Sequence, residues 1–256
     1  MVDDGLRVSG LGHGFGELPV LRDLSLDVAP REVVALVGPS GCGKSTLLEL
    51  IGGLASPRSG SISVGGAGTD SARLAACAYM PQHDTLLPWL RAIDNASLGP
   101  RLAGRSRAAA RATASPMFER LGLAGFELAR PAELSGGMRQ RVAFARTLLT
   151  GKPVLLLDEP FAALDAITRA DLQSWLRDVL AAEPRTTVLV THDVEEALYV
   201  ADRVLVLSKR PAHIVWEGAA PTTEREGNDR AATVTAPGFT HAREEALHAL
   251  GSGAPA

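Results

Sequence analysis

The sequence has few cysteines, little net charge and no long apolar run. Its two cysteines, Cys42 and Cys77, cannot form a disulfide framework and suit a reducing compartment. The formal charge is −3, from 26 basic and 29 acidic residues, so we expect no nucleic-acid partner. The apolar runs have the length of strands, whereas a membrane-spanning helix needs about 20 apolar residues. Residues 1–5 enter no apolar segment, so we expect no signal peptide and at most a peripheral membrane role.

Short apolar runs alternate with longer helical patterns, which favours an α/β fold with a mostly parallel sheet. Continuously apolar strands have both faces covered, as in doubly wound sheets. Such strands are expected at Val33–Val37, Val154–Asp158, Thr187–Thr191 and Val204–Leu207. Helices are expected at Lys44–Gly53, Met138–Leu149 and Ala166–Ala182, and after the N-cap residue Asp193. In the helix at 166–182, the apolar residues at helical spacing are Ile167, Ala170, Trp175, Leu176, Val179 and Leu180.

A second region differs in composition from this α/β pattern. From about Asp84 to Arg130 the strand pattern disappears and Ala, Arg and Leu dominate, which predicts an inserted helical subdomain. A local basic cluster there is interpreted as a solvated helix face; it consists of Arg101, Arg105, Arg107 and Arg111. The main domain is expected to cover residues 1–218. Residues 219–256 form a predicted tail with a short helix near Ala242–Leu250.

Residues 38–45 form a phosphate-binding pattern. They read Gly-Pro-Ser-Gly-Cys-Gly-Lys-Ser, match G-x-x-x-x-G-K-[ST], and lie between a predicted strand and a predicted helix. Glycines let backbone N–H groups wrap an anion, and the helix start adds a partial positive charge. A chance glycine-rich turn is the alternative, and the flanking elements disfavour it. The pattern therefore predicts a nucleotide site at Gly38, Pro39, Ser40, Gly41, Cys42, Gly43, Lys44, Ser45 and Thr46.

Within this loop, two side chains have expected roles. Lys44 is expected to bind the β- and γ-phosphates of ATP, and Ser45 to bind Mg²⁺. Cys42 is interpreted as a small filler residue, and the alternative is a thiol whose pKa is lowered by the helix start. We also expect MgATP to shield Cys42 from thiol reagents and Cys77 to be indifferent to nucleotide.

Two carboxylates are adjacent at the end of a predicted apolar strand: Asp158 is its last residue, and Glu159 comes directly after it. A carboxylate such as Asp158 can hold Mg²⁺, usually through water, because this ion dehydrates reluctantly. Its neighbour Glu159 can position or deprotonate an attacking water. Alone, the pair would be an ordinary acidic turn. Beside a phosphate-binding loop, we interpret it as a metal and catalytic pair.

Residues 134–140 read Leu-Ser-Gly-Gly-Met-Arg-Gln and resemble the signature motif of the ABC ATPases, with Met138 where that family often has glutamine. The resemblance runs from about Leu6 to Gly218, with every motif in the family's order. It implies a P-loop NTPase core with an N-terminal antiparallel β portion. It also implies a dimer with a second copy of the chain, in which Ser135, Gly136 and Gly137 bind the partner's ATP.

The same resemblance implies roles for four further residues. Gln82 resembles the Q-loop glutamine, which binds Mg²⁺ and takes part in catalysis with Glu159. His192 resembles the catalytic switch histidine, and Asp165 resembles the D-loop aspartate at the nucleotide. Phe15, in a predicted glycine-flanked loop, resembles the aromatic residue that stacks on adenine. A core aromatic is the alternative for Phe15.

Three short strings, at residues 86–89, 137–140 and 208–211, resemble importers of nitrate, sulfonates, taurine and thiamine precursors. This branch implies an ATPase subunit at the cytoplasmic face of the membrane, a separate membrane permease and, indirectly, a periplasmic or lipoprotein solute-binding protein. Trp89 is then either a permease contact or a core residue. The ATPase of an exporter remains an alternative, as does a soluble ABC ATPase, although this sequence has one phosphate loop and no C-x-x-C.

Overall fold

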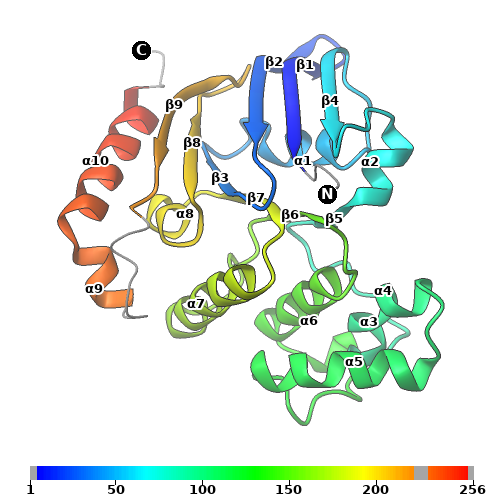
Figure 1. Ribbon diagram of the computed structural model, residues 1–256. Coiled ribbons are helices and arrows are strands. Elements are labelled where there is room, and N and C mark those ends of the chain that lie inside the picture. The colour runs from blue at the N-terminus through cyan, green and yellow to red at the C-terminus, as the bar shows by residue number, and fades with distance from the viewer. Residues whose placement is uncertain (1–4, 222–229, 253–256) are drawn as a thin grey trace.

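The computed structural model describes residues 5–221 and 230–252, so the predicted tail is described only in part. A six-stranded sheet in the order β5-β6-β7-β3-β8-β9 crosses the molecule (Figure 1). Its parallel strands are β3 (Val33–Val37), β5 (Cys77–Met80), β6 (Val154–Asp158), β7 (Thr186–Thr191) and β8 (Arg203–Leu207). β9 (Ile214–Ala219) pairs with β8 in the antiparallel direction. The four predicted apolar strands are β3, β6, β7 and β8, which confirms the α/β fold with a mostly parallel sheet.

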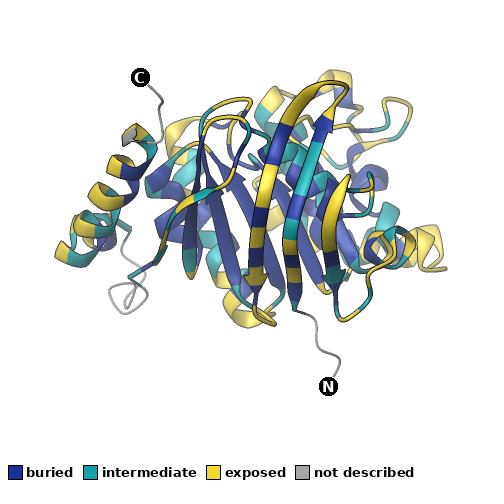
Figure 2. Cartoon of the chain, turned by 90° about the horizontal axis from the view of Figure 1, so that it is seen from above, coloured by how far each residue is buried: buried dark blue, intermediate teal, exposed yellow. Residues whose placement is uncertain are grey.

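A second, antiparallel sheet has the order β2-β1-β4. Its strands are β1 (Leu6–Phe15), β2 (Leu18–Val28) and β4 (Ser59–Val64). Burial varies along β2, whereas β3 is buried throughout, as Figure 2 shows by its banded outer strands and dark blue centre. An antiparallel sheet with one face in solvent has this pattern. The expectation of an N-terminal antiparallel portion is confirmed.

The pleat of the six-stranded sheet divides the core into two parts, because alternate side chains of a strand point to opposite faces. Val34 and Leu36 belong to the cluster that contains α1 (Lys44–Ile51) and the three-stranded sheet. Ala35 and Val37 belong to the cluster on the other face. Helices in that second cluster include α6 (Gly136–Leu148), α7 (Ala166–Ala182), α8 (Val194–Val200) and α10 (Pro237–Ser252). α1 therefore starts at the carboxyl edge of β3, between the two sheets.

Helices occupy the predicted insertion and extend beyond it into α6. They are α3 (Ala92–Ala96), α4 (Leu98–Leu102), α5 (Arg107–Arg120) and the short 3-10 helix η1 (Pro131–Glu133), while α2 (Asp70–Ala76) lies outside, between β4 and β5 (Figure 1). Asp94 is buried in α3 and accepts hydrogen bonds from Arg107 at 2.6 Å and Arg111 at 2.7 Å. Hydrogen bonds from Arg111 and then Arg107 hold the pKa of Asp94 well below its usual range. Arg107 is 57% exposed, as expected of a solvated face, whereas Arg111 is partly buried, and both arginines also tie α5 to α3.

The helix α7 begins and ends at the predicted residues. Its N-cap Asp165 accepts a hydrogen bond from the Thr168 N–H at 3.1 Å, the arrangement that starts a helix. Ile167, expected among the apolar face, is instead 77% exposed, whereas Leu176 is completely buried. Nine residues separate them, which is about half a turn around the axis at about 100° per residue. Ile167 therefore lies opposite the buried stripe, and that expectation is wrong.

The described part of the tail contains α9 (Arg230–Thr235) and α10, and α10 covers residues 242–250. Phe239 and Ala246 of α10 are buried in the core. Arg230 donates a hydrogen bond to Glu195 of α8 at 3.0 Å, which holds the tail on this helix. None of the helices within the described ranges combines the length and the apolar character needed to cross a bilayer.

Candidate functional site

The loop of residues 38–43 between β3 and α1 forms a cradle of backbone amides. Gly41 and Gly43 have φ values of +73° and +121°, in the region that favours glycine. A Cβ atom at Gly43 would lie 2.7 Å from Cγ1 of Val20, so a larger residue would push the loop away from β2. The Nζ atom of Lys44 donates to the carbonyl oxygens of Gly38 at 2.7 Å and Pro39 at 3.1 Å. The ammonium group is therefore held at the cradle.

A hollow of about 250 Å³ opens beside the cradle. It is lined by Phe15, Val20, Ser40, Gly41, Gly43, Lys44, Ser45, Thr46, Gln82 and Glu159. Phe15 is the last residue of β1 rather than part of a loop, and it is 59% exposed. This exposure excludes the interpretation of Phe15 as a core aromatic. Side chains that are far apart in the sequence thus share one hollow with the phosphate loop.

Asp158 is the last residue of β6 and is almost completely buried. Its carboxylate accepts a hydrogen bond from the hydroxyl of Ser45, and its Oδ2 atom lies 3.5 Å from the Tyr79 hydroxyl. Burial raises the pKa of Asp158, because the charged form loses solvation. No group of three His, Cys, Asp or Glu side chains forms a metal site within the described residues. A cation beside Asp158 and Ser45 would therefore need further oxygen ligands from phosphate or water.

Glu159 lies between two other predicted site residues. Its φ is +47°, and its backbone N–H donates to the carbonyl of Val190 at 2.9 Å, next to the end of β7. Its Oε2 atom lies 3.4 Å from Nε2 of Gln82 and 3.3 Å from Nδ1 of His192. The structure thus brings together the three side chains that the sequence analysis expects to take part in catalysis.

The signature residues lie elsewhere. Ser135 is the N-cap of α6, where its Oγ accepts a hydrogen bond from the Met138 N–H at 3.2 Å. Ser135, Gly136, Gly137 and Asp165 are not among the residues that line the hollow beside the cradle. Figure 1 shows α6 among the lower helices and α1 between the sheets above. The described chain therefore does not bring its own signature residues to its own phosphate loop.

Cys42 fits the interpretation of a small filler residue. It is buried in the cluster around α1, and burial raises the pKa of its thiol despite the nearby charge of Lys44. The alternative of a lowered pKa is wrong, because the loss of solvation outweighs the attraction of the ammonium group. Since the protein itself covers the thiol, we no longer expect MgATP to change its reactivity.

Sequence reasoning missed two residues near the site, Tyr79 and Val20. Tyr79 reaches Asp158 because β5 pairs with β6, with Tyr79 opposite Leu156. Val20 of β2 lines the hollow beside Gly43. Neither residue belongs to a motif. A prediction that β5 pairs with β6 would have placed Tyr79 near Asp158.

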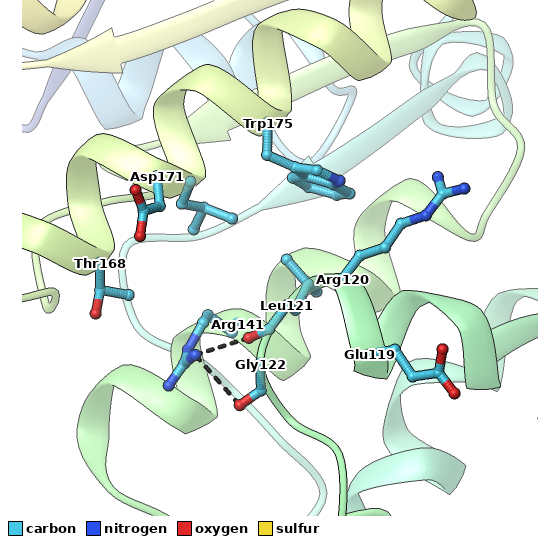
Figure 3. Close-up of a pocket in the computed structure, with 9 residues that line it drawn as sticks. Glu119, Arg120, Leu121, Gly122, Arg141, Thr168, Asp171 and Trp175 are labelled. Carbon is cyan, nitrogen blue, oxygen red and sulfur yellow. Dashed lines mark hydrogen bonds between the residues drawn. The ribbon is translucent and has the colours of Figure 1, made fainter. Parts of the chain in front are cut away.

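A second hollow, of about 280 Å³, lies between α7, the end of α5 and the middle of α6 (Figure 3). Arg141 of α6 donates to the carbonyl oxygens of Leu121 at 2.7 Å and Gly122 at 3.5 Å. Trp175 of α7 lines the same hollow. Because it contains none of the predicted site residues, we assign it no part in the chemistry.

Comparison with known proteins gives several similar sequences. An aliphatic sulfonates import ATP-binding protein of Rhodococcus jostii is 50% identical over 80% of this chain and 79% of that protein. A formylaminopyrimidine import ATP-binding protein of Halalkalibacterium halodurans is 44% identical, over 79% of each chain. A taurine import ATP-binding protein of Yersinia pestis is 41% identical over 94% of this chain and 95% of that protein.

Solved structures and a family profile agree with these sequences. A dimeric ATP-binding cassette in a post-hydrolysis state, bound to ADP and Pi, has a TM-score of 0.76 and 28% sequence identity. The match covers 84% of this chain and 98% of the cassette. The profile of the ABC transporter family matches residues 21–162, more than half of the chain. The chain therefore belongs to the ABC transporter family, whose cassettes bind and hydrolyse ATP.

Proposed function

We propose that this chain is the ATP-hydrolysing subunit of an importer for small sulfonates, and that it works at the cytoplasmic face of the membrane. The observation that carries this proposal is the similarity, at 41–50% identity, to import ATP-binding proteins for aliphatic sulfonates and taurine. Taurine is itself a sulfonate, so the two solutes share one chemical class. The solute would pass through a separate permease, to which a solute-binding protein delivers it.

ATP would bind with its phosphates in the cradle and its adenine on Phe15. The backbone amides of residues 38–43 and the start of α1 offer donors and partial positive charge to the phosphates. Lys44 would exchange its hydrogen bonds with the Gly38 and Pro39 carbonyls for contacts with phosphate oxygens. The exposed ring of Phe15 lines the same hollow, so an adenine can stack on it without rearrangement of the core.

Ser45, Asp158 and Gln82 would hold Mg²⁺ together with phosphate oxygens. The donors fit this ion, because Ser45 and Asp158 present hydroxyl and carboxylate oxygens within one hydrogen bond of each other. Mg²⁺ supplies charge neutralisation for the γ-phosphate. A cation would also favour the ionised form of Asp158 and so oppose the effect of burial on its pKa.

Glu159 would position or deprotonate the attacking water. Its carboxylate is held by Gln82 and His192 at 3.4 and 3.3 Å, distances that leave room to tighten around a substrate. Gln82 and His192 would then respond to the presence of the γ-phosphate. The arrangement supports hydrolysis in which this chain orients water and accepts its proton.

Ser135, Gly136 and Gly137 would act on the ATP of a second copy. The hydroxyl of Ser135 accepts from Met138, and a hydroxyl that accepts can still donate to a phosphate oxygen. The N-terminus of α6, a helix of 13 residues, adds a partial positive charge. The partner's signature would complete each cradle, with Asp165 next to the shared nucleotide.

Trp89 would contact the permease. It is 67% exposed, which excludes the interpretation of a core residue. The buried amide of Asn95 fixes its loop, because it accepts from the Leu87 N–H at 2.8 Å and donates to the Leu87 carbonyl at 3.1 Å. A rigid loop that carries an exposed tryptophan suits an interface.

Deletion of the gene in its own host tests this function. We expect the deletion strain to lose growth on taurine or an alkanesulfonate as sole sulfur source and to keep growth on sulfate. The wild-type gene should restore growth, and Glu159→Gln should not. Normal growth of the deletion strain on every sulfonate would contradict the solute class. If the deletion strain instead loses import of formylaminopyrimidine and the wild-type gene restores it, the solute class is that of the thiamine-precursor relatives.

A further inference from the structure

Arg139 of α6 connects the segment that follows Gln82 with the segment that precedes Ser135. Its Nε atom donates to Oδ2 of Asp84 at 2.9 Å, and its Nη1 atom donates to the carbonyl oxygen of Leu134 at 2.8 Å. One planar guanidinium group therefore contacts both segments through separate nitrogen atoms. A lysine, with a single nitrogen, cannot reproduce this fork.

Arg146, two turns further along α6, holds the same segment from the other side. It donates to the carbonyl oxygens of Asp84 at 2.8 Å and Thr85 at 2.9 Å, and to the Thr85 hydroxyl at 2.9 Å. Thr85 has a φ of +43°, an uncommon conformation for a β-branched residue. The segment 84–85 is thus bound to α6 at both its side chains and its backbone.

These contacts do little for stability alone. The side chains of Asp84 and Arg139 are 29% and 35% exposed, so solvent screens much of their attraction. Their position is more informative. Gln82, two residues before Asp84, lines the hollow beside the cradle, and Ser135 follows directly after Leu134.

We propose that Arg139 is a positioning residue that couples the nucleotide site of a chain to its own signature. ATP in the cradle moves Gln82, Asp84 follows, and Arg139 transfers the shift to Leu134 and Ser135. The signature of each chain thereby becomes competent for the partner's ATP only when its own cradle holds ATP. This inference rests on the proposed dimer with shared sites.

The test uses the full chain with Glu159→Gln as the parent, in which ATP is bound without rapid turnover. Adding Arg139→Gln should leave the affinity of the monomer for MgATP within about twofold, because the cradle is intact. The MgATP concentration for half-maximal dimerisation should rise about tenfold, a typical coupling between sites. Arg139→Lys should restore only part of this loss. A merely structural role would instead lower the melting temperature and the monomer affinity.

Asp84→Asn tests the connection from the other side and leaves α6 unchanged, so it decides the outcome if Arg139→Gln folds poorly. The double variant should dimerise no worse than the weaker single variant, because both changes break one connection. Arg7→Gln with Asp27→Asn removes an exposed ion pair of 2.8 Å in the three-stranded sheet and should change nothing.

Two results would overturn the inference. If the parent dimerises with MgATP and both Arg139→Gln and Asp84→Asn dimerise equally well, the coupling is wrong while the shared-site dimer stands. If the parent itself does not dimerise with MgATP, the shared-site dimer is wrong and the coupling falls with it.

Discussion

The Oε2 atom of Glu159 lies 3.3 Å from Nδ1 of His192, although 33 residues separate them along the chain. Glu159 follows β6 and His192 follows β7, and these parallel strands are neighbours in the sheet. The carboxyl ends of parallel strands meet at one edge, where ligands of α/β sheets bind. The contact places a carboxylate and an imidazole together beside the phosphate loop, and four predictions start from this arrangement and its surroundings.

Replacement of Glu159 by glutamine should slow turnover strongly without loss of ATP binding. The amide keeps the shape of the side chain but cannot accept a proton, and loss of such a group slows a reaction on the order of 10²–10⁴-fold. Steady-state phosphate release and equilibrium binding of MgATP check this. Glu119→Gln, an exposed glutamate at the second hollow, is the control. Turnover near the wild-type rate would disprove the role of Glu159.

Two inactive variants should complement each other when mixed. Lys44→Ala removes the cradle's ammonium group, and Ser135→Arg blocks the signature. In a Glu159→Gln background, a mixed dimer has one site with both defects and one site with an intact cradle and an intact signature. ATP-dependent dimerisation of the mixture should exceed that of either variant alone, as measured by analytical ultracentrifugation. No gain on mixing would show that each chain completes its own site.

Glu196 should make stability depend on pH. It is buried in α8, where Gln173 donates to its Oε2 at 3.0 Å, and Thr191 also hydrogen-bonds to it. Burial raises its pKa to about 7, helped by the charge of Asp193 and opposed by that of Arg169. The unfolded chain releases this proton near pH 4.5, so it binds fewer protons than the folded chain between pH 4.5 and about 7. The free energy of unfolding therefore falls as the pH rises through this window.

Glu196→Gln should remove this pH-dependent fall in the free energy of unfolding, because an amide does not titrate. The variant should match the wild type at pH 5 and exceed it at pH 8 by up to about 3 kcal/mol in the free energy of unfolding. Urea denaturation at the two pH values measures the difference, with the exposed Glu119→Gln as a control for the exchange of glutamate for glutamine at the surface. An equal effect of Glu196→Gln at both pH values would mean that this carboxylate does not titrate in the window.

Both cysteines should be inert in the folded protein. Cys42 and Cys77 are buried, and burial raises the pKa of Cys77 to about 11 and that of Cys42 above its ordinary value. A thiol reagent at pH 8 should label the native chain slowly, equally with and without MgATP, and label both thiols after unfolding in guanidinium. Rapid labelling of native Cys42, prevented by MgATP, would restore the earlier expectation of an accessible thiol.

Local patterns were sufficient for much of this protein. The phosphate loop follows from glycines at fixed spacing between an apolar strand and a helix, and Gly43 indeed has a backbone conformation that favours glycine. The ends of α7 follow from the N-cap Asp165 and from helical periodicity. These features depend on neighbours within a few residues, so a reading of the chain alone could find them. The motif resemblance added Gln82, His192 and Ser135 as predictions.

Only the tertiary structure decided which of these residues meet. Gln82 and Glu159 are 77 residues apart, and their contact depends on the order of strands in the sheet. Which helix faces are buried also depended on packing, as the exposed Ile167 shows. The same holds for charge, because only the packed chain places the buried Asp94 beside Arg107 and Arg111. Burial and long-range pairing are properties of the packed chain, because desolvation and hydrogen bonding act between surfaces that folding brings together.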